Sequence, residues 1–220
     1  MIIFFLSICD EHPHINKNSF ISLVNFRIKK NKMSFADELK SALHGHDLRS
    51  IELEFRVGFQ TTSGFVSSIP KVAWCAAQEK LSCGVETKTV DKYIKTRQDE
   101  ASRHVTTATG SYMEHKKKVA NNVVSPGGAY SIRGSIALEA QEPATRPPNS
   151  FVMQRTKYRT SYTRGPWRID FTRVEIIPVK NDIEEVFEIE VELADIGYFF
   201  EKELELVIDE GRKLAHSLVT

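Results

Sequence analysis

The chain has 220 residues, of which 41% are apolar and 27% are charged, so it can bury a core as one ordinary-to-large domain or two small ones. Its 30 basic and 29 acidic residues leave a net charge of +1, which excludes a nucleic-acid binder of bulk basic charge but leaves a local basic patch open. No apolar run approaches the ~20 residues of a membrane helix, and the three cysteines lack the CxxC spacing of a zinc site.

Residues 1–32 show no periodic pattern, whereas Met33 begins a stretch that predicts a helix, MSFADELKSALHG. Ser34 is placed to cap this helix with Asp37 at its third position, and Gly45 is a natural stop. We therefore expect a single folded domain over 33–220. Residues 1–32 are expected to be an extension that is either disordered or upstream of the true start.

The next two elements are an alternating strand and a helix. Apolar and charged residues alternate from about 50 to 59, which places Glu52, Glu54 and Arg56 on one face of a strand. The stretch 67–84 predicts a helix with Pro70 in its first turn and Gly84 as its terminator. This helix is expected to pack outside the sheet.

Short strands separated by turn residues dominate the rest of the chain. They are predicted near 86–94, 100–107, 111–119, 129–139, 152–162, 166–178 and 185–193, and a final helix is predicted over 195–219. The predicted fold class is therefore mainly β with flanking helices.

Several strands have a polar face of a single charge sign. The last strand, FEIEVEL, puts three glutamates on one face, the first strand puts two, and RTKYRTSY aligns three basic residues. A solvated outer face of an antiparallel sheet would explain any one of these strands. Like charges side by side destabilise a sheet, however, so several such strands in one domain are harder to explain in this way.

Charged faces that line the inside of a closed barrel are the alternative, with the apolar faces outward beneath the helices. Five clustered glutamates cannot all stay ionised without counter-charge, which a hard divalent cation such as Mg²⁺ or Mn²⁺ would supply. Facing rows of Arg and Lys would then hold an anion with several charges, such as a polyphosphate.

The two glutamate-rich strands, IELEFRVGF and FEIEVEL, resemble those of the triphosphate tunnel metalloenzymes. The run RTKYRTSY followed by WRIDFTRVE resembles, more narrowly, the metal-dependent mRNA 5′-triphosphatases of fungi, protozoa and large DNA viruses. The resemblance covers about residues 50–193 and implies a closed eight-stranded antiparallel β-barrel tunnel with a charged interior. One departure is Arg56, which stands where the superfamily often has lysine; arginine can still contact phosphate, but as a planar fork rather than as a compact charge.

The resemblance also implies roles for individual residues. The metal ligands of the family correspond to Glu52, Glu54 and Glu192. The acidic positions that orient water correspond to Glu188 and Glu190. The basic strand that grips the triphosphate corresponds to Arg155, Lys157 and Arg159, and the network on the next strand corresponds to Arg168, Asp170 and Thr172. Further substrate-binding positions correspond to Arg56, Asp91, Arg103, Lys116 and Glu139. The choice of Lys116 over Lys117 depends on strand parity, which a bulge would overturn.

The implied activity is Mg²⁺- or Mn²⁺-dependent hydrolysis of the γ-phosphate of triphosphate-ended RNA during mRNA cap formation. The diphosphate end would pass to a separate RNA guanylyltransferase, in the nucleus, or in the cytoplasm if the protein is viral; no membrane partner is expected, and a homodimer stays open. One alternative is a sister enzyme that acts on inorganic polyphosphate or thiamine triphosphate, or a cyclase of the same superfamily. Another is a non-catalytic β-barrel that binds RNA, although its glutamates would repel phosphate without a metal.

Overall fold

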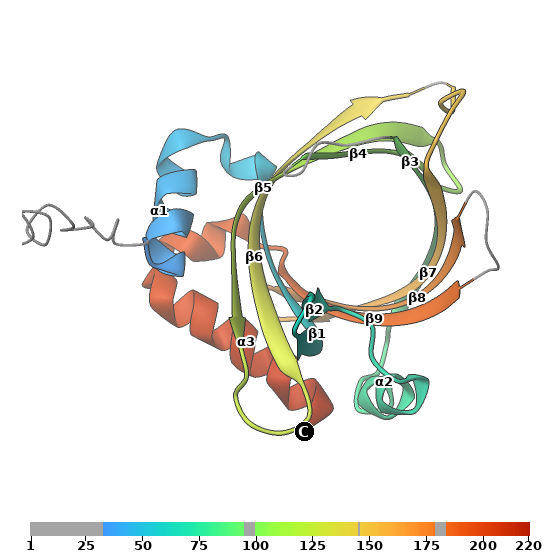
Figure 1. The fold of residues 1–220 in the computed structure, drawn as a ribbon. Coiled ribbons are helices and arrows are strands. Elements are labelled where there is room, and N and C mark those ends of the chain that lie inside the picture. The colour runs from blue at the N-terminus through green and yellow to red at the C-terminus, as the bar shows by residue number, and fades with distance from the viewer. Residues whose placement is uncertain (1–32, 95–99, 145, 179–183) are drawn as a thin grey trace, which may run out of the picture. The chain divides into compact units, whose positions relative to one another are not determined.

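A nine-stranded antiparallel sheet closes on itself in the computed structural model, which describes residues 33–94, 100–144, 146–178 and 184–220. The strand order is β2-β1-β6-β5-β4-β3-β7-β8-β9, and β1 also pairs with β9. Within the described residues β2 pairs with β1 alone, so eight strands form the closed ring (Figure 1). The predicted closed eight-stranded barrel is confirmed.

The strands lie close to the predicted ranges, with two of them longer than expected. The ring consists of β1 (Ile51–Thr61), β3 (Val85–Ile94), β4 (Glu100–Thr106), β5 (Ser111–Val124), β6 (Ser131–Pro143), β7 (Met153–Arg164), β8 (Trp167–Pro178) and β9 (Glu184–Leu193). A bulge between Lys118 and Ala120 shifts the register of β5 against β6. Since the bulge follows Lys116, the parity on which the choice of Lys116 depends is preserved.

The helices lie outside the ring, where α1 (Phe35–Gly45), α2 (Lys71–Gln78) and α3 (Leu204–Val219) flank its outer surface (Figure 1). The capping box of α1 forms as predicted, because Asp37 N donates to Ser34 Oγ at 3.1 Å and the helix ends at Gly45. None of the helices described is long and apolar enough to cross a membrane. Residues Ser34–Thr220 form one compact unit, and the prediction for residues 1–32 lies outside the described residues.

The apolar core lies between the outer face of the barrel and the helices. On β1 the outward residues Leu53, Phe55 and Val57 are fully buried, while the residues between them face the tunnel. Phe55 meets Trp167 edge to face at 5.9 Å between ring centroids. Trp74 of α2 donates to the Glu188 carbonyl at 3.1 Å, which fixes α2 beneath β9. The barrel is therefore charged inside and apolar outside.

Two local predictions were wrong, and one short strand was not predicted. Helix α2 ends at Gln78 rather than near Gly84. Gly84 lies against the sheet, where a Cβ atom on this residue would come within 2.8 Å of Thr160 and Tyr162, so the chain leaves the helix before it reaches Gly84. The last helix is two segments, a 3-10 turn over Ile196–Phe200 and then α3. Strand β2 (Gly64–Val66) was not predicted, because three residues are too few for a periodic pattern.

Candidate active site

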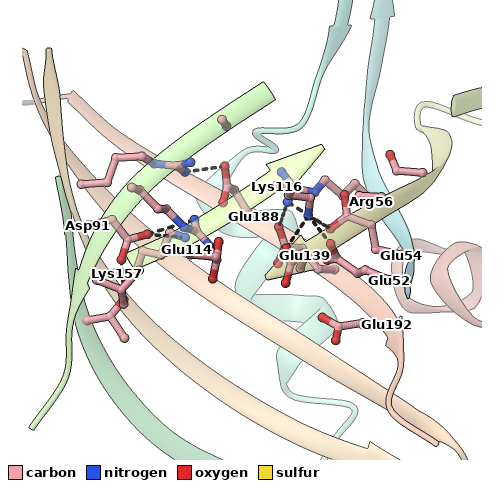
Figure 2. A pocket seen from close by; sticks show the side chains of 18 of the residues that line it. Glu52, Glu54, Arg56, Asp91, Glu114, Lys116, Glu139, Lys157, Glu188 and Glu192 are labelled. Carbon is pink, nitrogen blue, oxygen red and sulfur yellow. Dashed lines mark hydrogen bonds and ion pairs between the residues drawn. The ribbon is translucent and has the colours of Figure 1, made fainter. Parts of the chain in front are cut away.

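The tunnel encloses a cavity of about 700 Å³, and 18 of the 30 residues that line it are charged. Every residue that the sequence predicted for the site lines this cavity except Asp170 and Thr172, which are completely buried in the wall beneath it. Figure 2 shows Asp91, Glu114 and Lys157 in one group and Lys116, Glu139 and Glu52 in another. The predicted interior surface is therefore assembled from strands far apart in the sequence.

The acidic wall is formed where β1 meets β9, the pairing that closes the barrel. Glu54 lies opposite Glu192 and Arg56 lies opposite Glu190 in the register of the two strands. Arg56 also bridges the two strands, because it forms ion pairs of 3.1 Å with Glu54 of β1 and 2.7 Å with Glu190 of β9. Although burial opposes it, Arg56 and Arg159 hold the pKa of Glu190 well below its usual range.

The three predicted metal ligands are on these same two strands, but each carboxylate is already paired with a cation. Glu52 pairs with Lys116, Glu54 with Arg56, and Glu192 with Arg168 at 2.5 Å. Among the described residues no three His, Cys, Asp or Glu side chains converge as a metal site would require, and Glu192 lies apart from the others in Figure 2. The metal assignment stays a prediction, because ligation requires these side chains to exchange partners.

The chemistry of these carboxylates nevertheless fits a divalent cation. Burial, followed by the charge of neighbouring glutamates, raises the pKa of Glu54 despite Arg56 and Lys116. Burial and the nearby carboxylate of Glu52 likewise raise the pKa of Glu192 to about 8, against the pull of Arg168. Burial and the neighbouring carboxylates thus disfavour the ionised forms of Glu54 and Glu192, which a bound divalent cation would relieve, and oxygen ligands of this kind suit Mg²⁺ or Mn²⁺.

A pH dependence of stability follows from Glu192. Its pKa is near 4.5 when unfolded and about 8 when folded, so the folded state holds an extra proton between these values. In the presence of a chelator the melting temperature should therefore fall as the pH rises through this window, and Glu192→Gln should flatten the fall. Glu185→Gln, at the exposed start of β9, should leave it unchanged. An equal slope in Glu192→Gln and the unsubstituted protein would contradict the assignment.

The basic strand β7 faces the acidic wall. Arg155 pairs with Glu188 at 2.7 Å, and Lys157 pairs with Asp91 at 2.7 Å. Arg159 lies 3.0 Å from Asp170 and 3.2 Å from the Glu190 carboxylate. Three consecutive tunnel-facing cations are thus held by carboxylates of three other strands. Fixed in this way, they form a row of donors for an anion.

The Arg168–Asp170–Thr172 face of β8 supports that row from behind. Asp170 accepts from Arg168 at 3.0 Å and from Ser161 Oγ at 2.7 Å, besides its ion pair with Arg159. Arg159 also donates to Thr172 Oγ1 at 3.2 Å. Asp170 and Thr172 are completely buried, so they act by positioning the arginines and do not themselves reach the cavity.

The single charged positions on β3 to β6 form two further clusters. Asp91 accepts from Thr89 and also holds both Lys157 and Arg103, and these two cations keep the pKa of Asp91 below its usual range although burial opposes it. Lys116 contacts the carboxylates of Glu52 and of Glu139, the latter at 3.1 Å. The structure brings each of these residues into the wall of the same cavity.

Four charged residues of the wall lie outside the predicted site: Glu100 and Lys118, which are exposed, and Glu114 and Arg133, which are not. Glu114 is buried and pairs with Arg103, and its parity with Lys116 on β5 was the available signal. Arg133 of β6 lies opposite Arg56, and burial together with the charge of Arg56 lowers the pKa of Arg133. Arg133 stands among apolar and small residues, so no charge pattern marked it.

Comparison with known proteins gives consistent results. Residues 75–205 match the family model described as mRNA capping enzyme, beta chain. A protein of Paramecium bursaria Chlorella virus 1 named as a 5′RNA triphosphatase is 51% identical over 189 residues, which are 84% of this chain and 97% of that protein.

Solved structures agree at the level of the fold. The RNA triphosphatase Pct1 of S. pombe superposes with a TM-score of 0.61 at 18% identity, covering 94% of this chain and 90% of that chain. A structure of Pct1 in complex with the Spt5 CTD gives a TM-score of 0.59 at 16% identity over the same shares. At this identity the likeness concerns the architecture of the closed tunnel.

Proposed function

The chain belongs to the mRNA capping enzyme beta-chain family, and we propose that it hydrolyses the γ-phosphate of 5′-triphosphate-ended RNA to leave a 5′-diphosphate end. One observation carries this proposal: a single cavity is lined both by a carboxylate wall on β1 and β9 and by a row of cations on β7. Both groups suit a phosphate chain, because its oxygens can bind a metal held by the carboxylates and can also accept hydrogen bonds from the basic side chains.

The residues of β7 would bind the transferred phosphoryl group. Lys157 and Arg159 would donate to its equatorial oxygens, where negative charge is distributed in the transition state. Asp91 and Asp170 hold these two cations in place before substrate arrives. Preorganised donors of this kind need no reorganisation during the reaction, which is the main way that a protein accelerates phosphoryl transfer.

The family of triphosphate tunnel enzymes is generally metal-dependent, and we infer that Mg²⁺ or Mn²⁺ serves here. Glu52, Glu54 and Glu192 would hold the ion, which would neutralise charge on the γ-phosphate and help to position water. Glu190 is ionised but weakened as a base by Arg56 and Arg159. We therefore assign Glu190 to orienting these arginines, and leave the orientation of water to Glu188.

The direct test is phosphate release from γ-labelled triphosphate RNA. We expect release with Mg²⁺ or Mn²⁺ and none with chelator. Inorganic triphosphate and thiamine triphosphate are assayed beside it; efficient cleavage of either with no cleavage of RNA would overturn the proposal in favour of a sister activity. RNA binding without phosphate release under any metal would instead indicate a non-catalytic barrel. If the product is a diphosphate end, a separate guanylyltransferase would consume it.

A further inference from the structure

Arg133 and Phe65 lie together at the end of the tunnel where β1 turns into β2. Arg133 is opposite Arg56 in the pairing of β6 with β1, and it lines the cavity. Its guanidinium carbon lies over the Phe65 ring, 4.9 Å from the ring centroid. Arg56, which marks this end of the cavity on β1, follows Glu54 by two residues. The two residues are therefore about 7 Å apart along the strand.

Phe65 is held on the tunnel side of β1 by a glycine. Gly58 has the same strand parity as Glu54 and Arg56, so a side chain at Gly58 would point into the tunnel. A Cβ atom there would lie 2.7 Å from the Phe65 ring and 2.1 Å from the Val66 carbonyl oxygen. Glycine therefore lets the β2 segment fold close over β1, and the Phe65 ring is left half-buried at the tunnel end.

Arg133 differs from the other basic residues of the wall in having no acidic partner. Among the described basic residues that line the cavity, only Arg133 and Lys118 lack an ion pair; Lys118 is exposed, whereas Arg133 is half-buried. Its Nε is fully buried and makes no hydrogen bond with the described residues; the Nε atoms of Arg56, Arg103 and Arg155 share this property, but carboxylates hold the terminal nitrogens of those three arginines. A buried donor without an acceptor costs free energy, which a bound anion would recover.

We propose that Arg133 and Phe65 form the docking site for the 5′-terminal nucleotide of the RNA. Arg133 contacts the phosphate that stays attached to the ribose, and the half-exposed Phe65 ring stacks with the first base. Arginine and aromatic side chains are the usual partners of phosphate and of unpaired bases in single-stranded RNA. The RNA chain then leaves the tunnel at the β1–β2 hairpin. This inference rests on the proposed function.

The test compares two substrates that share the triphosphate but not the nucleoside. The ratio of kcat/KM for triphosphate RNA to kcat/KM for inorganic triphosphate is measured in Phe65→Ala, with Phe65→Tyr as the conservative variant. We expect this ratio to fall about ten-fold in Phe65→Ala, as for the loss of one stacked base, and to be retained in Phe65→Tyr. Arg133→Gln should instead raise KM for both substrates, since inorganic triphosphate also places a phosphate at the position of the α-phosphate that Arg133 contacts.

Tyr158→Ala is the matched control, because Tyr158 is also an aromatic residue stacked with an arginine, but on the outer face of the barrel. The guanidinium carbon of Arg173 lies 4.1 Å from the centroid of the Tyr158 ring. It should leave the ratio unchanged. If Phe65→Ala lowers both activities in the same proportion, Phe65 has only a structural role and the inference is overturned. Failure of the unsubstituted protein to cleave triphosphate RNA would overturn the proposed function itself, so the two failures are distinguishable.

Discussion

Replacing Glu54 by Gln is expected to lower metal-dependent phosphate release at least about a hundred-fold, the size of effect seen when one preorganised charge contact of a transition state is removed. Glu54 is 3% exposed and lies between Arg56 and Lys116 on the acidic wall. The substitution removes a charged oxygen from the predicted metal site while keeping the shape of the side chain. The measurement is steady-state phosphate release from γ-labelled RNA over a range of Mg²⁺ concentrations.

The fold should survive this substitution. Burial already raises the pKa of Glu54, which means that the structure disfavours its charged form, so a neutral isostere should not lower the melting temperature without metal. Glu185→Gln, at the exposed start of β9, is the matched control and should retain full activity. Full activity of Glu54→Gln at low Mg²⁺ would remove Glu54 from the metal site. Partial recovery at high Mg²⁺ would support weakened metal binding.

Replacing Gly211 by Leu is expected to lower the free energy of unfolding by about 3 kcal/mol or more, because it overpacks the interface of α3 with the barrel. A Cβ atom on Gly211 would already lie 2.3 Å from Phe55 Cε2 and 2.6 Å from Trp167 Cη2. These rings are packed edge to face in the core and have no space to move into. Denaturant unfolding followed by circular dichroism measures the loss.

The glycine at the end of α1 provides the control for this experiment. Nothing lies within 4 Å of the position that a Cβ atom would occupy on Gly45, so Gly45→Ala should be neutral or slightly stabilising. A Gly211→Leu protein as stable as the unsubstituted chain would show that α3 does not pack on the barrel as described. The comparison thus tests the outer core independently of any activity.

The alternation of charged and apolar residues carried most of the prediction. On β1, β7 and β9 a period of two separated tunnel-facing residues such as Glu54 and Lys157 from core-facing residues such as Phe55, and the structure bears out that separation. The capping box at Ser34 was likewise local and was confirmed. These features were predictable because each depends on residues within a few positions of one another.

Features that depend on close approach of distant segments were not predictable. Helix α2 ends early because Gly84 must lie against side chains of β7, and β2 folds over Gly58 in a segment too short to have a pattern. Arg133 has no charged neighbours on its own strand, and its importance appears only when β6 lies beside Arg56. In each case the deciding neighbour is far away in the sequence.

The sequence by itself determined that this chain forms strands with charged faces of uniform sign. That pattern favoured a closed barrel with a charged interior, and the family resemblance implied its eight strands and its site residues. Only the tertiary structure decided which charge meets which. Lys116 contacts Glu52 although 64 residues separate them. Glu192 of β9 likewise pairs with Arg168, which lies on the neighbouring strand β8. Strand parity is a local property of the backbone, whereas ion pairs across a tunnel depend on register and closure, which are set by the packing of the whole barrel.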